Sequence, residues 1–184
     1  MRAIRKCRVI FAFLTVSLPG LAAAREPPPL EAYGALPGIE DIAISPSGTR
    51  IAVTTEASGG RRLMVLDQDM KAILSMGADG LKVRGLSFVG DDMLLAMRTQ
   101  TVEVSGFVAD RYELAQGIVF NLQKSNEVAT IYQGNLRISS AVFGNYGVRR
   151  DENGKWAGYF GALEYQRSAH GDWIFDHGRP ALFK

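Results

Sequence analysis

The feature that most constrains this chain is a unit of short strand-like segments that recurs along it. In the first copy, runs of β-branched and other apolar residues alternate with turn signals such as Pro46-Ser47-Gly48 and Ser58-Gly59-Gly60. A helical period is confined to one short candidate at 111–116. The sequence therefore predicts an all-β fold. The strands expected in the first copy are 39–45, 50–55, 62–67 and 72–76.

The same unit begins again about 44 residues later, which is a spacing typical of propeller blades. The segment around Ile44 aligns with the segment around Phe88 when one residue is deleted. A third copy is expected to start near Leu136 and to turn at 151–155. The remaining strands are expected at 93–96, 117–122 and 128–132 in the second copy, and at 156–165 and 180–184 in the third.

Repeated four-stranded units indicate sheets stacked around an axis, with both faces of each sheet packed against neighbours. The run 156–163 fits this pattern, because bulky apolar side chains occupy both its even and its odd positions. We predict an incomplete β-propeller of about three four-stranded blades. Blade 1 covers about 39–77, blade 2 about 81–133, and blade 3 starts near 136 and is unfinished. The alternative is a β-sandwich with degenerate turns.

Residues 1–24 have the features of a secretory signal peptide: a basic start, an apolar run and small residues before Ala24. The apolar run is about ten residues, half of the roughly 20 that a membrane helix needs. The signal holds four basic residues and no acidic one, so its removal changes the net charge from +2 to −2. It also holds Cys7, the single cysteine. The mature chain then has no thiol for a disulfide, a metal or catalysis.

After cleavage behind Ala24, the protein is expected in the periplasm or outside the cell. Residues 25–38 are a proline-rich lead before the repeats. The weak net charge argues against nucleic acid as a partner. No association with a membrane is expected once the signal has been removed.

The order of these features resembles the N-terminal part of exported bacterial serine peptidases of the prolyl oligopeptidase family, of the acylaminoacyl-peptidase or dipeptidyl-aminopeptidase type. The segments that carry the resemblance are 39–53, 111–114, 142–147 and 156–161. It implies a propeller that caps an α/β-hydrolase domain with a Gly-x-Ser-x-Gly elbow and a Ser, Asp, His triad. The implied reaction is hydrolysis of a peptide or acyl-peptide bond through an acyl-enzyme.

The sequence departs from that pattern, because it contains no Gly-x-Ser-x-Gly motif. The nearest string, Gly85-Leu86-Ser87-Phe88-Val89, lies where the repeat predicts a strand. No residue is therefore assigned as catalytic, cofactor-binding or metal-binding. We expect a substrate-gating propeller portion that is inert alone, with the peptide substrate handled by a hydrolase domain beyond Lys184. The alternatives are a non-enzymatic periplasmic propeller that binds a protein or small ligand, and a small β-domain or oligomer-closed array of this natural length.

A metal site near the C-terminus is the first of several weaker candidates. His170 and His177 lie close to Asp172 and Asp176. The separation of the two histidines differs from the usual zinc spacings, so polar loop or strand positions are the preferred interpretation.

Four further features have both a structural and a functional interpretation. Asp91-Asp92 occupies a turn position in the repeat but also pairs two carboxylates. Arg61-Arg62 and Arg149-Arg150 flank turns and offer charge to a carboxylate terminus. The insertion 100–113 is interpreted equally as a simple surface hairpin or as a rim segment that reaches a partner or ligand. The aromatic concentration fits packing between blades, with a stacking platform as the alternative; its members are Trp156, Tyr159, Phe160, Tyr165, Trp173 and Phe175.

Overall fold

A computed structural model describes residues 27–30, 38–57, 59–103, 111–124, 127–171 and 173–184. The chain divides into two compact units, Met1–Ala35 and Leu36–Lys184. The predicted signal 1–24 and most of the lead 25–38 lie outside the described residues. In the part that is described, no helix is long and apolar enough to cross a membrane.

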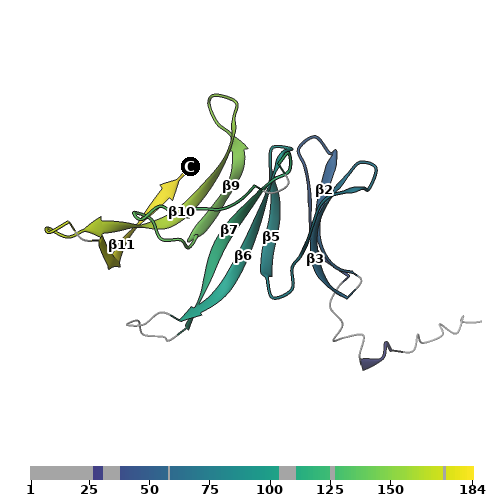
Figure 1. The fold of residues 1–184 in the computed structure, drawn as a ribbon, viewed down its shortest axis with the longest axis horizontal. Helices are drawn as coiled ribbons and strands as arrows, with labels where there is room; N and C mark the ends of the chain where they lie inside the picture. The colour runs from purple at the N-terminus through teal and green to yellow at the C-terminus, as the bar shows by residue number, and fades with distance from the viewer. Residues whose placement is uncertain (1–26, 31–37, 58, 104–110, 125–126, 172) are drawn as a thin grey trace, which may run out of the picture. The chain divides into compact units, whose positions relative to one another are not determined.

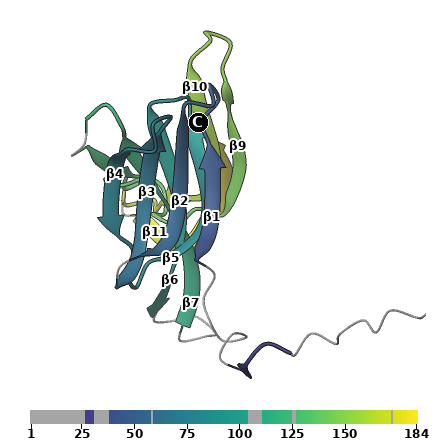
Figure 2. The ribbon, with the colours of Figure 1, turned by 90° about the vertical axis from the view of Figure 1, so that its right-hand side faces the viewer.

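Eleven strands are described, and they form three antiparallel sheets (Figure 1). In each sheet the strands follow one another in sequence order, as a meander. The first sheet consists of β1 (Ile39–Ile44), β2 (Arg50–Ala57), β3 (Gly60–Asp67) and β4 (Ala72–Gly77), which lie side by side in Figure 2. The second consists of β5 (Lys82–Val89), β6 (Met93–Glu103), β7 (Arg111–Asn121) and β8 (Val128–Thr130). The third consists of β9 (Gly144–Arg150), β10 (Trp156–Arg167) and β11 (Trp173–Phe183).

The second sheet is buried on both of its faces. Leu94 belongs to a core shared with the first sheet, whereas its neighbour Leu95 belongs to a core shared with Phe160 of the third. Successive side chains of a strand point to opposite faces, so adjacent leucines in β6 serve different cores. A sheet that is stacked between two other sheets needs apolar side chains on both of its faces, and β6 provides them. The first core also contains Ala52, Leu63, Val65, Phe88, Ala96 and Phe120.

The turn 90–92 joins the second sheet to both neighbours. The backbone N–H of Ser47 donates to Asp91 Oδ1 at 2.9 Å, and hydrogen bonding from Ser47 lowers the pKa of Asp91. Arg50 donates to the Asp91 carbonyl and lies 3.2 Å from Asp92 Oδ1. On the other side, a Cβ built on Gly90 would lie 2.6 Å from Cδ1 of Trp156 in the third sheet. The turn that the repeat predicts is present, and its carboxylates tie two sheets together.

The third repeat differs from the prediction at both ends. Its first strand begins at Gly144 and not near Leu136, although Ile138 forms a single antiparallel bridge with Glu164 of β10. Its last strand begins at Trp173, earlier than the predicted 180–184. β11 pairs with residues 160–167 of β10, with a register shift between Tyr165 and Gln166. The third sheet therefore has three strands in the described residues, and no closed propeller is formed by them.

The region 100–116 is strand throughout its described part. The helical candidate at 111–116 is wrong, because these residues belong to β7 and pair with β6 from Glu103↔Arg111 onward. The insertion 100–113 thus extends the β6–β7 hairpin, and 104–110 lie outside the described residues. Of the two interpretations, the described residues have the geometry of a hairpin.

Candidate functional site

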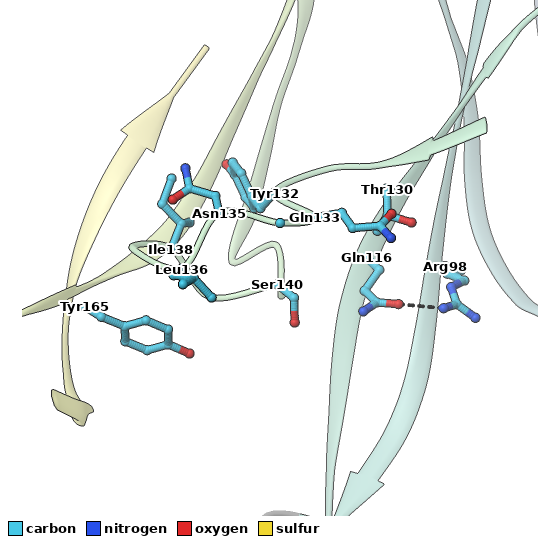
Figure 3. Close-up of a pocket in the computed structure, with 11 residues that line it drawn as sticks. Arg98, Gln116, Thr130, Tyr132, Gln133, Asn135, Leu136, Ile138, Ser140 and Tyr165 are labelled. Atoms are coloured by element: carbon cyan, nitrogen blue, oxygen red, sulfur yellow. Dashed lines mark hydrogen bonds between the residues drawn. The ribbon is translucent and has the colours of Figure 1, made fainter. Parts of the chain in front are cut away.

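A polar cavity of about 500 Å³ lies between the second sheet and the segment that leads to the third (Figure 3). Its floor includes Arg98 of β6 and Gln116 of β7, which are directly paired in the sheet. The connecting segment 132–140 and Tyr165 of β10 form the opposite wall. This volume is in the range of small-molecule binding sites.

Arg98 is the charged group of this cavity. Its Nη2 donates to Gln116 Oε1 at 2.6 Å. Its Nε is buried and has no hydrogen-bond partner among the described residues, and within them Arg98 forms no ion pair. A guanidinium has five N–H donors, so most of the hydrogen-bonding capacity of Arg98 is not used by described protein groups.

Tyr132 fixes the shape of the connecting wall. Its backbone has φ of 67°, a left-handed conformation that is costly for a residue with a Cβ. Two contacts hold it: the hydroxyl donates to the Phe160 carbonyl at 3.1 Å, and the ring meets Phe183 edge-on at 5.5 Å. Burial raises the pKa of the Tyr132 hydroxyl. The strained residue is thus anchored on the third sheet.

Tight turns complete the wall. The N–H of Gln133 donates to the Thr130 carbonyl, and the N–H of Asn135 donates to the Tyr132 carbonyl, both at 3.1 Å. These bonds occupy main-chain groups. Gln133 and Asn135 both line the cavity, and in Figure 3 the side chain of Gln133 is directed toward Thr130 and that of Asn135 away from it.

A second polar cluster covers one face of β5, β6 and β7, with Glu113 at its centre. Thr99 Oγ1 donates to the Glu113 carboxylate at 2.6 Å, and Lys82 and Arg84 contribute ion pairs of 3.1 and 3.2 Å. Hydrogen bonds, that from Thr99 first and those from Lys82 and Arg84 next, lower the pKa of Glu113 from 4.5 to about 2. The cluster is exposed and fully paired, so it is a surface network and not an acid–base centre.

This low pKa predicts a pH effect. A carboxyl whose pKa is lower in the folded state contributes stability above its unfolded pKa, and loses that contribution as the pH falls through the folded value. We therefore expect stability to decline between pH 4.5 and about 2 more steeply in the native protein than in Glu113→Gln. Acid titration followed by NMR should give Glu113 a pKa near 2, and Thr99→Val should raise it. A Glu113 pKa near 4.5 in the native protein would contradict the network.

The histidine candidates do not converge on a metal site in the described residues. His170 is exposed in a turn, where its N–H donates to Ser168 Oγ at 3.2 Å. The side chains of Asp172, Asp176 and His177 lie outside the described residues, although 176 and 177 belong to β11. Among the residues that are described, no three His, Cys, Asp or Glu side chains are grouped closely enough to hold a metal ion. Ser87 lies within β5, where the sequence pattern predicts a strand.

The arginine pairs have structural partners. Arg61 forms a forked ion pair with Glu40, with Nε 2.7 Å from Oε1, and also donates to the Leu81 carbonyl. Arg62 donates to Ser75 Oγ at 2.9 Å. On the third sheet, Arg149 stacks on Tyr159 at 4.5 Å and Arg150 on Trp156 at 5.3 Å. These aromatic rings therefore face guanidinium groups of their own sheet.

Sequence reasoning missed Arg98, Gln116 and Tyr132. One signal was available: alternation places Arg98 on the face of β6 that carries the buried Leu94 and Ala96. A charged residue that follows buried apolar residues on the same face of a strand indicates that the apolar core ends there and a polar surface begins. The conformation of Tyr132 has no comparable signal, because glycine or asparagine is the usual residue at positive φ.

Comparison with known proteins gives a distant structural likeness. No protein-family profile matches the chain, and no curated protein matches it. A solved structure of acylaminoacyl peptidase in complex with Z-Gly-Gly-Phe-chloromethyl ketone is similar, with a TM-score of 0.42 and 15% identity. The likeness covers 81% of this chain and 24% of that chain, so the chain spans about a quarter of the peptidase. At this TM-score the likeness by itself assigns neither a family nor an activity.

Proposed function

We propose that the chain is part of a β-propeller, and that the propeller gates substrate access in an exported serine peptidase. The supporting observation is that three meander sheets follow one another and the middle one is buried on both faces. This is the packing of consecutive blades. A barrel or a two-sheet sandwich does not need a third sheet stacked on the second.

The outward face of the first sheet supports the same proposal. Pairing in the sheet places Ile42 beside Val53, and Val53 beside Met64, on the face away from the core shared with the second sheet. Ile42 is 55% exposed, and Ile44 on that face is 63% exposed. A propeller needs at least four blades, and in the proposed protein a further blade covers this face.

The peptidase assignment rests on the sequence resemblance. The chemistry would reside in an α/β-hydrolase domain outside this sequence, in which a serine attacks the peptide or acyl-peptide carbonyl and forms an acyl-enzyme. The propeller would admit short peptides to that serine and exclude folded proteins. Residues 1–24 would direct export, so we place the protein in the periplasm or outside the cell. The partner of the chain is then the peptide substrate, reached through the hydrolase domain.

We expect the 184-residue chain to be inert alone. Incubation with aminoacyl and acyl-peptide chromogenic substrates should release no product above the buffer rate, because the chain has no Gly-x-Ser-x-Gly motif. Turnover that a serine-directed fluorophosphonate blocks would contradict this expectation. For the peptidase assignment, the product of the whole parent reading frame should cleave the same substrates. Replacement of the serine in a downstream Gly-x-Ser-x-Gly with alanine should abolish cleavage.

A non-enzymatic propeller that binds a small ligand or protein is the second candidate. The polar cavity at Arg98 favours it, because a gating domain does not require a cation in such a place. Reading the parent gene beyond Lys184 separates the two. Further blade repeats with no Gly-x-Ser-x-Gly support the binding protein, and a hydrolase region supports the peptidase.

A further inference from the structure

Arg98 differs from several arginines around it in having no carboxylate partner among the described residues. Other arginines of the first two sheets are paired: Arg50 with Asp92, Arg61 with Glu40, and Arg84 with Glu113. Arg98 is partly buried, and its side-chain contact among the described residues is with the neutral amide of Gln116. A partly buried cation is stabilised by an anion that accepts its N–H groups.

From this geometry we propose that the cavity binds a short peptide by its C-terminal carboxylate, with Arg98 as the carboxylate-binding residue. The planar guanidinium matches a carboxylate through two parallel N–H···O bonds. Gln116 holds one Nη2 hydrogen and so orients the plane of the guanidinium. Among the described residues that line the cavity Arg98 is the single cation, and it matches the single negative charge of a chain terminus.

The remaining lining suits peptide groups. Gln133 presents an amide and Ser140 a hydroxyl, so both N–H and C=O groups of a ligand have partners, while Asn135 Oδ1 already accepts from the Arg137 N–H at 3.0 Å. Tyr165 and Leu136 add apolar surface for a side chain. A cavity of about 500 Å³ has room for a peptide of two or three residues. The anchored Tyr132 keeps this wall in place without a ligand.

The inference does not depend on the peptidase assignment. It concerns binding, which a titration measures without turnover. A failure to bind peptide therefore leaves the propeller and the peptidase proposals standing, and absent catalysis leaves this proposal standing.

The first experiment is isothermal titration of the chain with three probes: N-acetyl-Ala-Ala, its C-terminal amide, and acetate. We expect the free acid to bind roughly tenfold or more tightly than the amide, because the amide cannot accept two charge-assisted hydrogen bonds. It should also bind roughly tenfold or more tightly than acetate, because acetate offers no peptide groups. Equal affinity for the amide would overturn carboxylate recognition. Equal affinity for acetate would overturn the peptide as the ligand class.

The second experiment tests Arg98. Arg98→Gln should weaken N-acetyl-Ala-Ala binding roughly tenfold or more, and Arg98→Lys should retain part of it, because lysine keeps the charge but not the planar fork. Arg62→Gln is the matched control, since Arg62 lies on β3 and pairs with Ser75 away from the cavity. The affinity of the Arg62→Gln variant for N-acetyl-Ala-Ala should equal that of the native chain. If Arg98→Gln binds as well as the native chain, the proposal fails.

NMR of the native chain keeps the proposal testable if Arg98→Gln does not fold. Titration with N-acetyl-Ala-Ala should shift the Arg98 Nε–H and the Gln116 side-chain amide signals. Shifts confined to other residues would overturn the site.

Discussion

Replacement of Leu94 or Leu95 with alanine is expected to lower the free energy of unfolding by about 3 kcal/mol in each case, measured by urea denaturation. Both side chains are fully buried. They are neighbours on β6, but Leu94 packs with residues such as Phe88 and Phe120, whereas Leu95 packs with Val142 and Phe160. Each substitution removes methyl groups from a different core and leaves a cavity there.

Two control variants and one contradicting outcome make this result specific. Met93→Ala, at the 41%-exposed start of the same strand, should cost less than about 1 kcal/mol. The two leucine effects should add in the double variant, because the two cores share no member. A neutral Leu95→Ala beside a costly Leu94→Ala would show that the third sheet does not pack on the second in solution.

The first repeat could be predicted from sequence because its turns and its alternation coincide. The expected strands 39–45, 50–55, 62–67 and 72–76 correspond to β1 to β4 within two residues at each end. Turn residues such as Gly48, with φ of 75°, mark the ends of strands directly. Hydrophobic alternation then defines which residues lie between the turns.

The third repeat was harder because an apolar pattern reports burial and not strand pairing. Ile138, Ala141 and Val142 are all buried, so the run reads as a strand. In the structure they belong to a connection that packs against its neighbours and makes few ladder bonds to β10. The hydrophobic pattern of the sequence cannot distinguish a buried segment that forms no regular strand pairing from a buried strand.

The candidate site could not be predicted because its parts meet only in three dimensions. Arg98 and Gln116 come from adjacent strands, while the opposite wall depends on the backbone conformation of Tyr132. The turn at Asp91 was predicted as a turn, but its bond to Ser47 joins residues from two different repeats. The local sequence pattern predicts the strands and turns, whereas the candidate site is formed by contacts between residues that are far apart in the sequence.

Gly90→Ala is expected to lower the free energy of unfolding by about 2 to 3 kcal/mol. Gly90 has φ of 67°, so any Cβ there carries a cost of about 1 kcal/mol or more for the left-handed conformation. The new Cβ would also lie 2.6 Å from Cδ1 and 3.0 Å from Nε1 of Trp156, so the indole ring must move. Displacement of a packed ring adds a further cost of about 1 kcal/mol or more.

Gly154→Ala separates these two effects, because Gly154 has φ of 74° and nothing within 4 Å of its Cβ position. Gly154→Ala should lower the free energy of unfolding only by the cost of the left-handed backbone conformation, about 1 kcal/mol. The excess loss at Gly90 should vanish when Trp156 is replaced with alanine, since the ring that obstructs the new methyl group is then gone. Tryptophan emission in a Trp173→Phe background should shift in Gly90→Ala and not in Gly154→Ala. Equal losses at the two glycines in the native background would mean that the ring of Trp156 does not rest on the turn, and the contact between second and third sheets at this end would have to be abandoned.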